Sequence, residues 1–499
     1  MQRIQRLTAS EREFLARLSE FVFSNSYDEP RVDLLRGLMP DHSAPMRPED
    51  HRRLSEVVTR RLTRLDAAGP ATVDQFPPED RPLVEIGFLY PTYHRYLEDL
   101  DRLIERQLRS EAPLEVSFAR DLYTDLAQRG FGEGATGRYF GFFFQLRRAF
   151  YFIERSLPGQ SPSMRRLRRD LWNSTFTHDM RSFGQQLWNR MEDFSTLLLG
   201  ETGTGKGSAA SAIGRSSFIP FAPTRRTFVE NFATSFIALN LSQFPETLIE
   251  SELFGHRKGS FTGAINDYAG VFARCSEHGG LFLDEIGEIG VPIQIKLLQV
   301  LQERTFTSLG SHEVKRFKGR VIAATNQSLD QLRSQGRFRA DLFYRLCSDI
   351  IVVPPLRVRL EEAPGELEEL VAVLVARMTG EPNAALSDRL LSALRRDLPA
   401  GYPWPGNVRE LEQAVRRIVL TGTYRGDRRE TDRPASPDDA FLDAIRSGAL
   451  TADELVAGYC ALLHRRHPTY VEVAERTGLD RRTVRKHLAP AGRPRPLTR

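Results

Sequence analysis

The sequence predicts a multidomain α/β protein in which a parallel sheet core is flanked by helical regions. Between Thr196 and Val353, short apolar runs such as STLLLG, GGLFLDE and RVIAATN alternate with helix-like stretches, which is typical of βαβ units. Residues 1–155 and 363–424 instead carry apolar side chains at helical spacing. A polar, proline-bearing stretch, YRGDRRETDRPASPDD, separates these regions from a small helical module at the C-terminus.

Length and composition limit the classes of protein that the chain can belong to. Its 499 residues are enough for about three domains of roughly 150 residues each. No apolar run approaches the roughly 18 residues that a membrane helix needs, and MQRIQRLTASEREF has no apolar signal core. We therefore expect a cytoplasmic protein without a membrane partner. The three cysteines lie far apart, so no disulfide or cysteine–metal framework is expected.

Residues 1–155 are predicted to form a mainly helical N-terminal regulatory region. Thr8 and Glu11 have the spacing of a capping box, and apolar residues follow at helical intervals. The region contains no catalytic motif and no receiver-like set of aspartates at strand ends, so the signal that it senses stays open. Leu157-Pro158-Gly159 breaks the helical pattern, which predicts a domain boundary nearby.

A phosphate-binding loop is predicted after the first strand of the sheet. GETGTGK follows the apolar run Thr196–Leu199 and precedes the helix-like SAASAIGR. Glycines let backbone N–H groups close on phosphate oxygens, and Lys206 is expected to reach the β- and γ-phosphates of ATP. The position that normally carries a magnesium-binding hydroxyl is Gly207. The candidate nucleotide-binding residues here are Gly200, Glu201, Thr202, Gly203, Thr204, Gly205, Lys206, Gly207 and Ser208.

Two further predicted strands end in polar side chains. Asp284 and Glu285 follow an apolar strand; Asp284 is the candidate ligand of Mg²⁺, and Glu285 is the candidate catalytic base that polarises the attacking water. Paired acids can also be a solvated strand end, but the P-loop upstream favours the catalytic interpretation. Asn326 ends the run VIAATN and is expected to orient water or sense the γ-phosphate.

These motifs together resemble those of the bacterial enhancer-binding proteins, the sigma-54-dependent transcriptional activators with an AAA+ ATPase core. The resemblance covers roughly residues 157–423 and is carried by GETGTGKG, LIESELFGHRKGSFTGA, GGLFLDEIGE, IKLLQVLQE, AATN, GRFRADLFYRL, VPPLR and YPWPGNVRELE. It implies an AAA+ α/β core at 156–362, a helical lid at 363–424, a linker at 425–450 and a Fis-like helix-turn-helix DNA-binding domain at 451–499.

The resemblance also implies roles for single residues. Arg339 and Arg345 match the family's arginine fingers, which reach the nucleotide of a neighbouring subunit in a ring. A surface ion pair is the alternative for either arginine. Arg409 matches the lid arginine called sensor II. Asn240 matches the asparagine that holds the catalytic glutamate until ATP is sensed. These assignments imply a homo-oligomer, from dimer to hexamer, that binds ATP and Mg²⁺.

One surface loop is implied to contact sigma-54. The family motif GAFTGA tips a loop that moves during the ATPase cycle, and this chain has GSFTGA, with Ser260 in place of alanine. The implied contact residues are Gly259, Ser260, Phe261, Thr262, Gly263 and Ala264.

Other departures from the family pattern favour a divergent subfamily. Family members often carry glutamate where Gly207 stands, so the missing hydroxyl has precedent while glycine itself is unusual. Two extra segments, FTHDMRSFGQQLWNRMEDF and PFAPTRRTFVENFATS, lie on either side of the P-loop and its helix.

The C-terminal module is predicted to bind DNA. Residues 461–499 contain ten Lys or Arg against three Asp or Glu, which suggests an anionic partner, with a solvated tail as the alternative. TYVEVAERTGLDRRTVRKHL resembles a helix-turn-helix in which Gly478 permits a left-handed turn. The candidate DNA-binding residues lie on its second helix: Arg481, Arg482, Thr483, Arg485 and Lys486.

The leading functional prediction is a sigma-54-dependent activator. It would bind upstream DNA and use ATP hydrolysis to remodel sigma-54 RNA polymerase holoenzyme. Gly207 leaves one alternative open, a DNA-binding regulator whose ATP site is degenerate. A remodelling ATPase with another target is a third possibility, against which Phe261-Thr262 argues.

Overall fold

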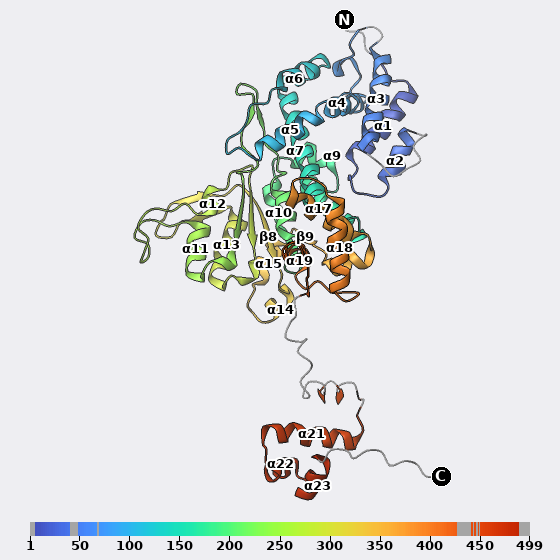
Figure 1. The fold of residues 1–499 in the computed structure, drawn as a ribbon. Helices are drawn as coiled ribbons and strands as arrows, with labels where there is room; N and C mark the ends of the chain where they lie inside the picture. Colours follow the sequence, from blue (N-terminus) through green and yellow to red (C-terminus); the bar gives the residue numbers. More distant parts are fainter. Residues whose placement is uncertain are drawn as a thin grey trace, which may run out of the picture. The chain divides into compact units, whose positions relative to one another are not determined.

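The computed structural model describes residues 5–39, 48–66, 69–426, 441–442, 444–445, 448 and 450–488. The chain forms two compact units, Met1–Tyr424 and Arg425–Arg499 (Figure 1). The first unit contains the N-terminal helices, the sheet and a group of helices that follows it. The second contains the C-terminal helices.

The N-terminal region is helical, as predicted. The first helix, α1 (Ala9–Phe23), begins at the predicted capping box, in which the Thr8 and Glu11 side chains each accept the other residue's backbone N–H. The helices that follow are α2 (Arg31–Leu38), α3 (Pro48–Leu65), α4 (Arg81–Arg95), α5 (Leu97–Gln107), α6 (Ala119–Gln128), α7 (Glu133–Ser156), α8 (Pro162–Phe176) and the short α9 (Met180–Ser182).

The central sheet is parallel and has the order β4-β5-β8-β1-β9. Its strands are β1 (Thr196–Leu199), β4 (Phe236–Asn240), β5 (Gly280–Asp284), β8 (Arg320–Thr325) and β9 (Asp349–Val352). Every residue of β8 is buried, as expected for an apolar strand that is covered on both faces. Because all strands are parallel, their carboxyl ends meet at one edge of the sheet.

Helices and two small hairpins surround this sheet (Figure 1). The helices are α10 (Lys206–Gly214), α11 (Glu246–Phe254), α12 (Val271–Arg274), α13 (Val291–Glu303), α14 (Leu329–Ser334) and α15 (Ala340–Leu346). One hairpin joins β2 (Phe221–Ala222) to β3 (Thr227–Phe228), and the other joins β6 (Thr305–Thr307) to β7 (Val314–Arg316).

The N-terminal helices share a hydrophobic core with one face of the sheet. That core contains residues of α1 to α8 together with Leu198 of β1, Phe282 of β5 and Ile322 of β8. The β2–β3 hairpin, which belongs to the second extra segment, takes part in it: the Phe144 and Phe228 rings stack with centroids 4.0 Å apart. The helical region is therefore a packed layer on one face of the sheet.

A buried arginine joins this layer to the helix that follows the P-loop. Arg148 of α7 donates to the carbonyl oxygens of Arg215 and Ser217, each at 2.7 Å, just beyond the C-terminal end of α10. Burial lowers the pKa of Arg148 to about 9. A cation at a helix C-terminus satisfies free carbonyls and complements the helix dipole.

A second helical group with its own core follows the sheet. It contains α16 (Leu356–Glu362), α17 (Glu366–Thr379), α18 (Ala384–Asp397) and α19 (Asn407–Thr421). The group includes the region predicted as the lid, residues 363–424, and also the preceding helix α16, and we call the whole group the lid. Their apolar faces meet around Leu370, Leu411 and Trp404.

The second unit contains α21 (Ala452–Arg466), α22 (Tyr470–Thr477) and α23 (Arg481–Leu488). Gly478 ends α22 with φ 69°, the left-handed conformation that the sequence predicts. Cys460, Val473 and Val484, one from each helix, form the centre of a small core. Most of the predicted linker, residues 427–440, lies outside the described residues. In the part of the chain that the structure describes, no helix is long and apolar enough to span a bilayer.

Candidate nucleotide site and contact surfaces

The P-loop turns tightly between β1 and α10. Gly203 and Gly205 have φ values of 80° and 106°, which favour glycine. At Gly203 a Cβ atom would also overlap the carbonyl oxygen of Gly406 in the lid. The turn directs the N-terminal end of α10 toward the carboxyl edge of the sheet, which is the geometry of an anion site.

Lys206 lies on the inner side of this loop. Its Nζ donates to the carbonyl oxygens of Gly200 at 2.9 Å and Glu201 at 3.2 Å. Burial lowers the pKa of Lys206, while the nearby carboxylates of Glu285 and Asp284 act in the opposite direction. The ammonium group is thus close to both strand-end acids.

Asp284 ends β5, and Glu285 follows it in a left-handed conformation with φ 57°. Such a backbone is uncommon for glutamate and is often found at functional sites. Burial raises the pKa of Glu285; Lys206 lowers it and Asp284 raises it. A carboxylate with a raised pKa is a better proton acceptor near neutral pH.

Asn326 connects the P-loop to Glu285, the candidate catalytic base. Its Nδ2 donates to Thr202 Oγ1 at 2.8 Å, and its backbone N–H donates to Glu285 Oε2 at 3.4 Å. The ends of β1, β5 and β8 are therefore joined by polar contacts.

Asn240 lies at the end of β4, in register with Asp284 of β5. Its side-chain oxygen accepts the backbone N–H of Ser242 at 3.0 Å and the Ser242 hydroxyl at 2.7 Å. Among the described residues no hydrogen bond joins Asn240 to Glu285. Asn240 therefore lies on the strand next to β5, and its side-chain oxygen bonds the turn that follows β4 rather than Glu285.

The lid contacts the P-loop through residues that the sequence analysis did not select. Asn407 Nδ2 donates to Glu201 Oε2 and to the Thr202 carbonyl oxygen, each at 3.1 Å, and its Oδ1 accepts the backbone N–H of Leu356. Arg357 forms two hydrogen bonds with Glu201, at 2.6 and 2.8 Å. Asn407 belongs to the motif YPWPGNVRELE, and its backbone is left-handed with φ 54°. Asn adopts this conformation more readily than most residues.

Arg409, the predicted sensor II residue, lies in the first turn of α19, the helix that begins at Asn407. Its backbone N–H donates to the Gly203 carbonyl oxygen at 3.3 Å. Arg409 is also close enough to Lys206 to lower that lysine's pKa. It therefore lies beside the predicted phosphate site.

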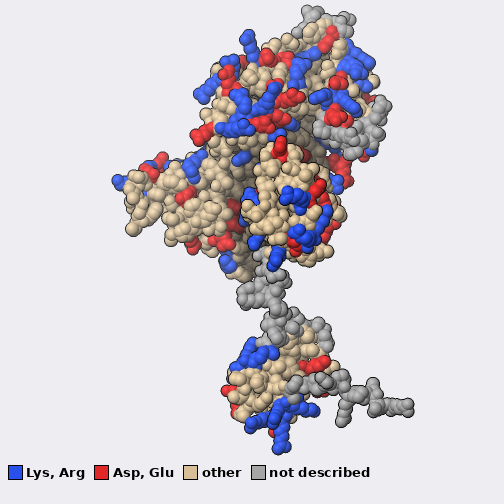
Figure 2. All heavy atoms as spheres, in the orientation of Figure 1, with Lys and Arg blue, Asp and Glu red and all other residues tan. Residues whose placement is uncertain are grey.

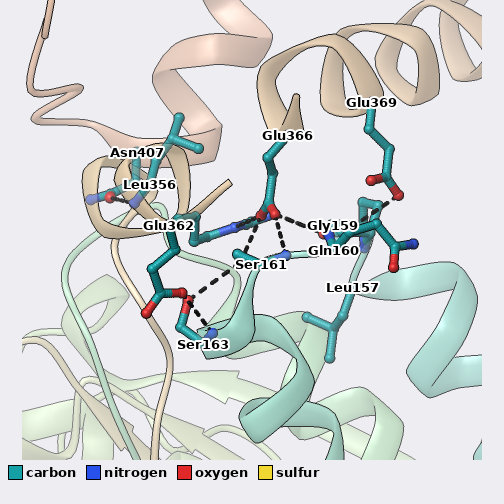
Figure 3. Close-up of polar contacts among 12 residues, drawn as sticks. Leu157, Gly159, Gln160, Ser161, Ser163, Leu356, Glu362, Glu366, Glu369 and Asn407 are labelled. Atoms are coloured by element: carbon teal, nitrogen blue, oxygen red, sulfur yellow. Dashed lines mark hydrogen bonds and ion pairs between the residues drawn. The ribbon is translucent and has the colours of Figure 1, made fainter. Parts of the chain in front are cut away.

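The segment between α7 and α8 is held by carboxylates of the lid (Figure 3). Glu366 accepts the backbone N–H groups of Gln160 and Ser161 at 3.0 and 2.6 Å, and Glu362 accepts that of Ser163 at 2.7 Å. Arg359 pairs with Glu366 at 2.5 Å, and both side chains are almost fully buried. The sequence break at Leu157-Pro158-Gly159 thus supplies free N–H groups that the lid binds.

The two candidate arginine fingers lie on and beside α15. Arg339 is the N-cap residue, and its guanidinium binds Asp341 with two hydrogen bonds, at 3.0 and 2.7 Å. Arg345 Nε donates to the Leu301 carbonyl oxygen at 2.8 Å. In this single chain neither side chain contacts Lys206, Asp284 or Glu285.

The segment Gly259–Ala264 forms the turn of the loop between α11 and α12, which extends away from the sheet in Figure 1. His256 and Tyr268 exchange two backbone hydrogen bonds at its base. The half-buried Phe261 ring lies against His256 with centroids 4.9 Å apart. Ser260 Oγ donates to the Arg257 carbonyl oxygen at 2.5 Å, so this hydroxyl stabilises the turn.

A basic helix face marks the second unit. Arg481, Arg482, Arg485 and Lys486 are exposed on α23, Thr483 is half-buried, and Val484 fixes the helix in the core. Figure 2 shows Lys and Arg side chains gathered on this unit where Figure 1 has α23. The arrangement suits contact with a nucleic-acid backbone.

The class of protein is defined by the sheet, the P-loop and the loop at 259–264 taken together. Residues 175–351 match the family model described as Sigma-54 interaction domain. The resemblance to sigma-54-dependent activators that the motifs predicted is therefore confirmed for this part of the chain.

Particular relatives agree with this class. The chain is 41% identical over 275 residues to the Nif-specific regulatory protein of Azotobacter vinelandii, covering 54% of this chain and 45% of that protein. It is 38% identical over 303 residues to the transcriptional regulatory protein ZraR of Klebsiella oxytoca, covering 60% and 63%. The chain thus spans less than two thirds of the length of these curated relatives. A crystal structure of NtrX from Brucella abortus in complex with ADP aligns over 74% of this chain and 80% of that chain, with 21% identity and a TM-score of 0.40.

Proposed function

We propose that this protein is a cytoplasmic, sigma-54-dependent transcriptional activator. It binds upstream DNA through α23 and hydrolyses ATP at the carboxyl edge of the sheet. Hydrolysis drives the 259–264 loop against sigma-54 RNA polymerase holoenzyme. The matched region covers only part of each relative, so the activity of the whole protein is a proposal.

The observation that carries the proposal is the convergence of Lys206, Glu285 and Asn326 at one edge of the sheet. Lys206 would exchange its two carbonyl contacts for phosphate oxygens. Glu285 would accept a proton from the attacking water, which its raised pKa favours. Asn326 would orient that water.

A bound Mg²⁺ ion would neutralise part of the phosphate charge, and Asp284 is the residue that would bind the ion. The fit is chemical: carboxylate and phosphate oxygens are the ligands that Mg²⁺ prefers. Gly207 offers no hydroxyl, and beyond its two chain neighbours and its own helix backbone no heavy atom lies within 4 Å of the position that its Cβ would occupy. Ser208, the next residue, carries the hydroxyl that is closest along the chain.

The arginines support a ring of subunits. Arg339 and Arg345 lie away from their own chain's phosphate site, so they would serve the site of a neighbouring copy. A fixed guanidinium fork stabilises the charge that develops on the γ-phosphate. We propose a homo-oligomer that closes into a hexamer for hydrolysis.

One alternative function has a specific observation in its favour. Gly207 lacks the usual hydroxyl, which would suit a DNA-binding regulator with a degenerate ATP site. The rest of the site weighs against it, since Lys206, Asp284, Glu285 and Asn326 are all present and lie together.

The test is steady-state ATPase activity and ATP affinity of the Glu285→Gln variant. We expect ATP binding within a few-fold of wild type and turnover lowered by about 10²–10⁴-fold, as for loss of a general base. Glu303→Gln, which changes an exposed carboxylate on α13, is the matched control and keeps wild-type turnover. Wild-type turnover in Glu285→Gln would remove the catalytic assignment, and absence of turnover in the wild-type protein would favour the degenerate regulator.

A further inference from the structure

A cavity of about 290 Å³ lies between the first extra segment and the base of the β6–β7 hairpin. Its walls include Arg190 and Asp193, just before β1, and Arg316 and Lys318, just before β8. The P-loop follows the opposite end of β1. Because β1 and β8 are parallel, the cavity lies at the amino edge of the sheet, away from the nucleotide site.

The wall of this cavity is predominantly cationic. Arg190, Arg304, Arg316 and Lys318 contribute four positive charges, against the carboxylates of Glu192 and Asp193. Lys318 is paired outside the cavity with Glu277 at 2.7 Å. Arg190 and Arg316 are exposed, and within the described residues their side chains form no ion pair or hydrogen bond.

Arg304 supplies the buried part of the wall. Its side chain is 14% exposed, with one Nη donating to the Gly319 carbonyl oxygen at 3.1 Å and the other 3.6 Å from Asp193. Its Nε is buried and has no hydrogen-bond partner among the described residues. Arg304 therefore brings a largely desolvated positive charge to the wall, and such a charge attracts an anion more strongly than a fully solvated one does.

We propose that this cavity binds a small phosphorylated molecule. The wall has four cations and two carboxylates, and Glu277 offsets one of the cations, so a bound anion would balance the positive charge that remains. Arginine forks match phosphate oxygens. Glu192 can accept from a hydroxyl or amino group on the same ligand. The volume is at the lower end of the range of roughly 300–1,000 Å³ typical of ligand pockets, so a metabolite-sized compound fits.

The site is connected to the loop at 259–264 through the β6–β7 hairpin. Arg316 belongs to β7, and at the hairpin's turn Leu309 accepts the Arg257 backbone N–H at 2.9 Å and donates to Gly255 at 2.9 Å. Arg257 also pairs with Glu313 at 2.8 Å. Ligand binding would therefore bias the position of the contact loop; this regulatory consequence rests on the proposed function, whereas binding itself does not.

The experiment is isothermal titration of inorganic pyrophosphate into the full-length chain carrying Lys206→Ala, which weakens the P-loop site. We expect saturable binding that Arg190→Gln combined with Arg316→Gln weakens at least 10-fold. Both substitutions change exposed side chains, and circular dichroism should report unchanged folding. Arg225→Gln, at another exposed arginine in unit Met1–Tyr424, is the control and leaves affinity unchanged.

Two results would overturn the proposal: no pyrophosphate binding in the Lys206→Ala chain, or binding that the double substitution leaves unchanged. Because the readout is direct binding, it requires neither ATP hydrolysis nor sigma-54. A failed ATPase or transcription assay would therefore count against the proposed function without affecting this site.

Discussion

Asn407 connects three parts of the ATPase core through a single side chain. It is fully buried and bonds Glu201, the Thr202 carbonyl and the Leu356 backbone N–H. Because these partners belong to the P-loop and to α16, Asn407 joins the phosphate loop directly to the lid helices. The contact also explains why Gly203 must be glycine, since the lid backbone lies against it.

A buried histidine pair makes the N-terminal helices sensitive to pH. The His51 and His94 rings lie 5.3 Å apart, and neither nitrogen of His94 has a hydrogen-bond partner among the described residues. Burial lowers the pKa of His51 to about 4 and that of His94 to about 3. The positive charge of Arg147 acts in the same direction on both.

We predict that this pair destabilises the fold as the pH falls. Both pKa values lie below the unfolded value near 6.5, so the unfolded chain binds more protons between about pH 6.5 and 4. Stability is unaffected by the pair above that window and falls within it, by up to about 2 kcal/mol per histidine between pH 6.5 and 5. Urea unfolding at pH 7.5 and 5.0 should show that the free energy of unfolding falls less in the His51→Phe/His94→Phe variant than in the wild type. Equal losses would contradict the assignment.

The contact between the lid and the α7–α8 segment joins several secondary-structure elements. The segment turns at Gly159, with φ 125°, and presents successive N–H groups to α16 and α17. On the lid side, the buried Arg359–Glu366 pair completes the contact, and Arg359 also donates to the Pro158 carbonyl oxygen at 2.7 Å. The lid is thereby tied to the connection between the N-terminal helices and the sheet.

We predict that Glu366→Gln strongly destabilises the first unit. Removing one partner of a buried ion pair leaves an uncompensated charge and typically costs about 3–5 kcal/mol. Glu412→Gln breaks the exposed pair with Arg416 and should cost at most about 1 kcal/mol. The measurement is the free energy of unfolding from urea titrations of both variants. Similar values for the two would mean that the buried pair contributes no more than a surface pair.

The local parts of the candidate site could be predicted from the sequence, because each is encoded in a short contiguous stretch. Glycine spacing predicts the turn of the P-loop, and apolar runs that end in Asp284 and Asn326 predict strand ends at one edge. Contacts between distant segments could not be predicted. Nothing local indicates that Arg357 would meet Glu201, or that Glu366 would bind the backbone at Ser161.

The two extra segments show the same limit at the scale of elements. In the sequence, the two segments stand out only as departures from a family pattern. In the structure the second forms the hairpin against which Phe140 and Phe144 of α7 pack, and Phe183 and Trp188 of the first lie against Phe142. Both segments therefore build the surface on which the N-terminal helices lie. Aromatic content alone could not reveal this, because it does not identify the partner.

At the scale of the molecule, the N-terminal layer and the sheet form one compact unit, and the C-terminal helices form another. The domain boundaries drawn from the sequence remain predictions. The shared core and Arg148 connect the N-terminal helices to α10 through packed side chains and hydrogen bonds. The proposed DNA contact, by contrast, lies on a unit with its own core.

We predict that Arg485→Ala in the full-length protein weakens DNA binding and leaves ATPase activity unchanged. If Arg485 contacts a base edge, its loss should weaken the free energy of DNA binding by about 1–3 kcal/mol. If it contacts a phosphate, its loss should reduce the salt dependence of binding by about one released counterion. Fluorescence anisotropy with upstream DNA at several salt concentrations measures both. Arg466→Ala on α21 is the control. Unchanged affinity in Arg485→Ala would move the recognition surface away from α23.

We propose that ATP hydrolysis is coupled to sigma-54 through the loop at 259–264. The measurement that tests this coupling is ATP-dependent open-complex formation by sigma-54 holoenzyme with the Phe261→Ala variant. The control is Ile265→Ala, an exposed apolar residue just outside the loop. We predict that Phe261→Ala keeps ATPase activity within about two-fold of wild type, because it is remote from the phosphate site, and forms no open complexes. Open complexes at the wild-type rate in Phe261→Ala would contradict the account.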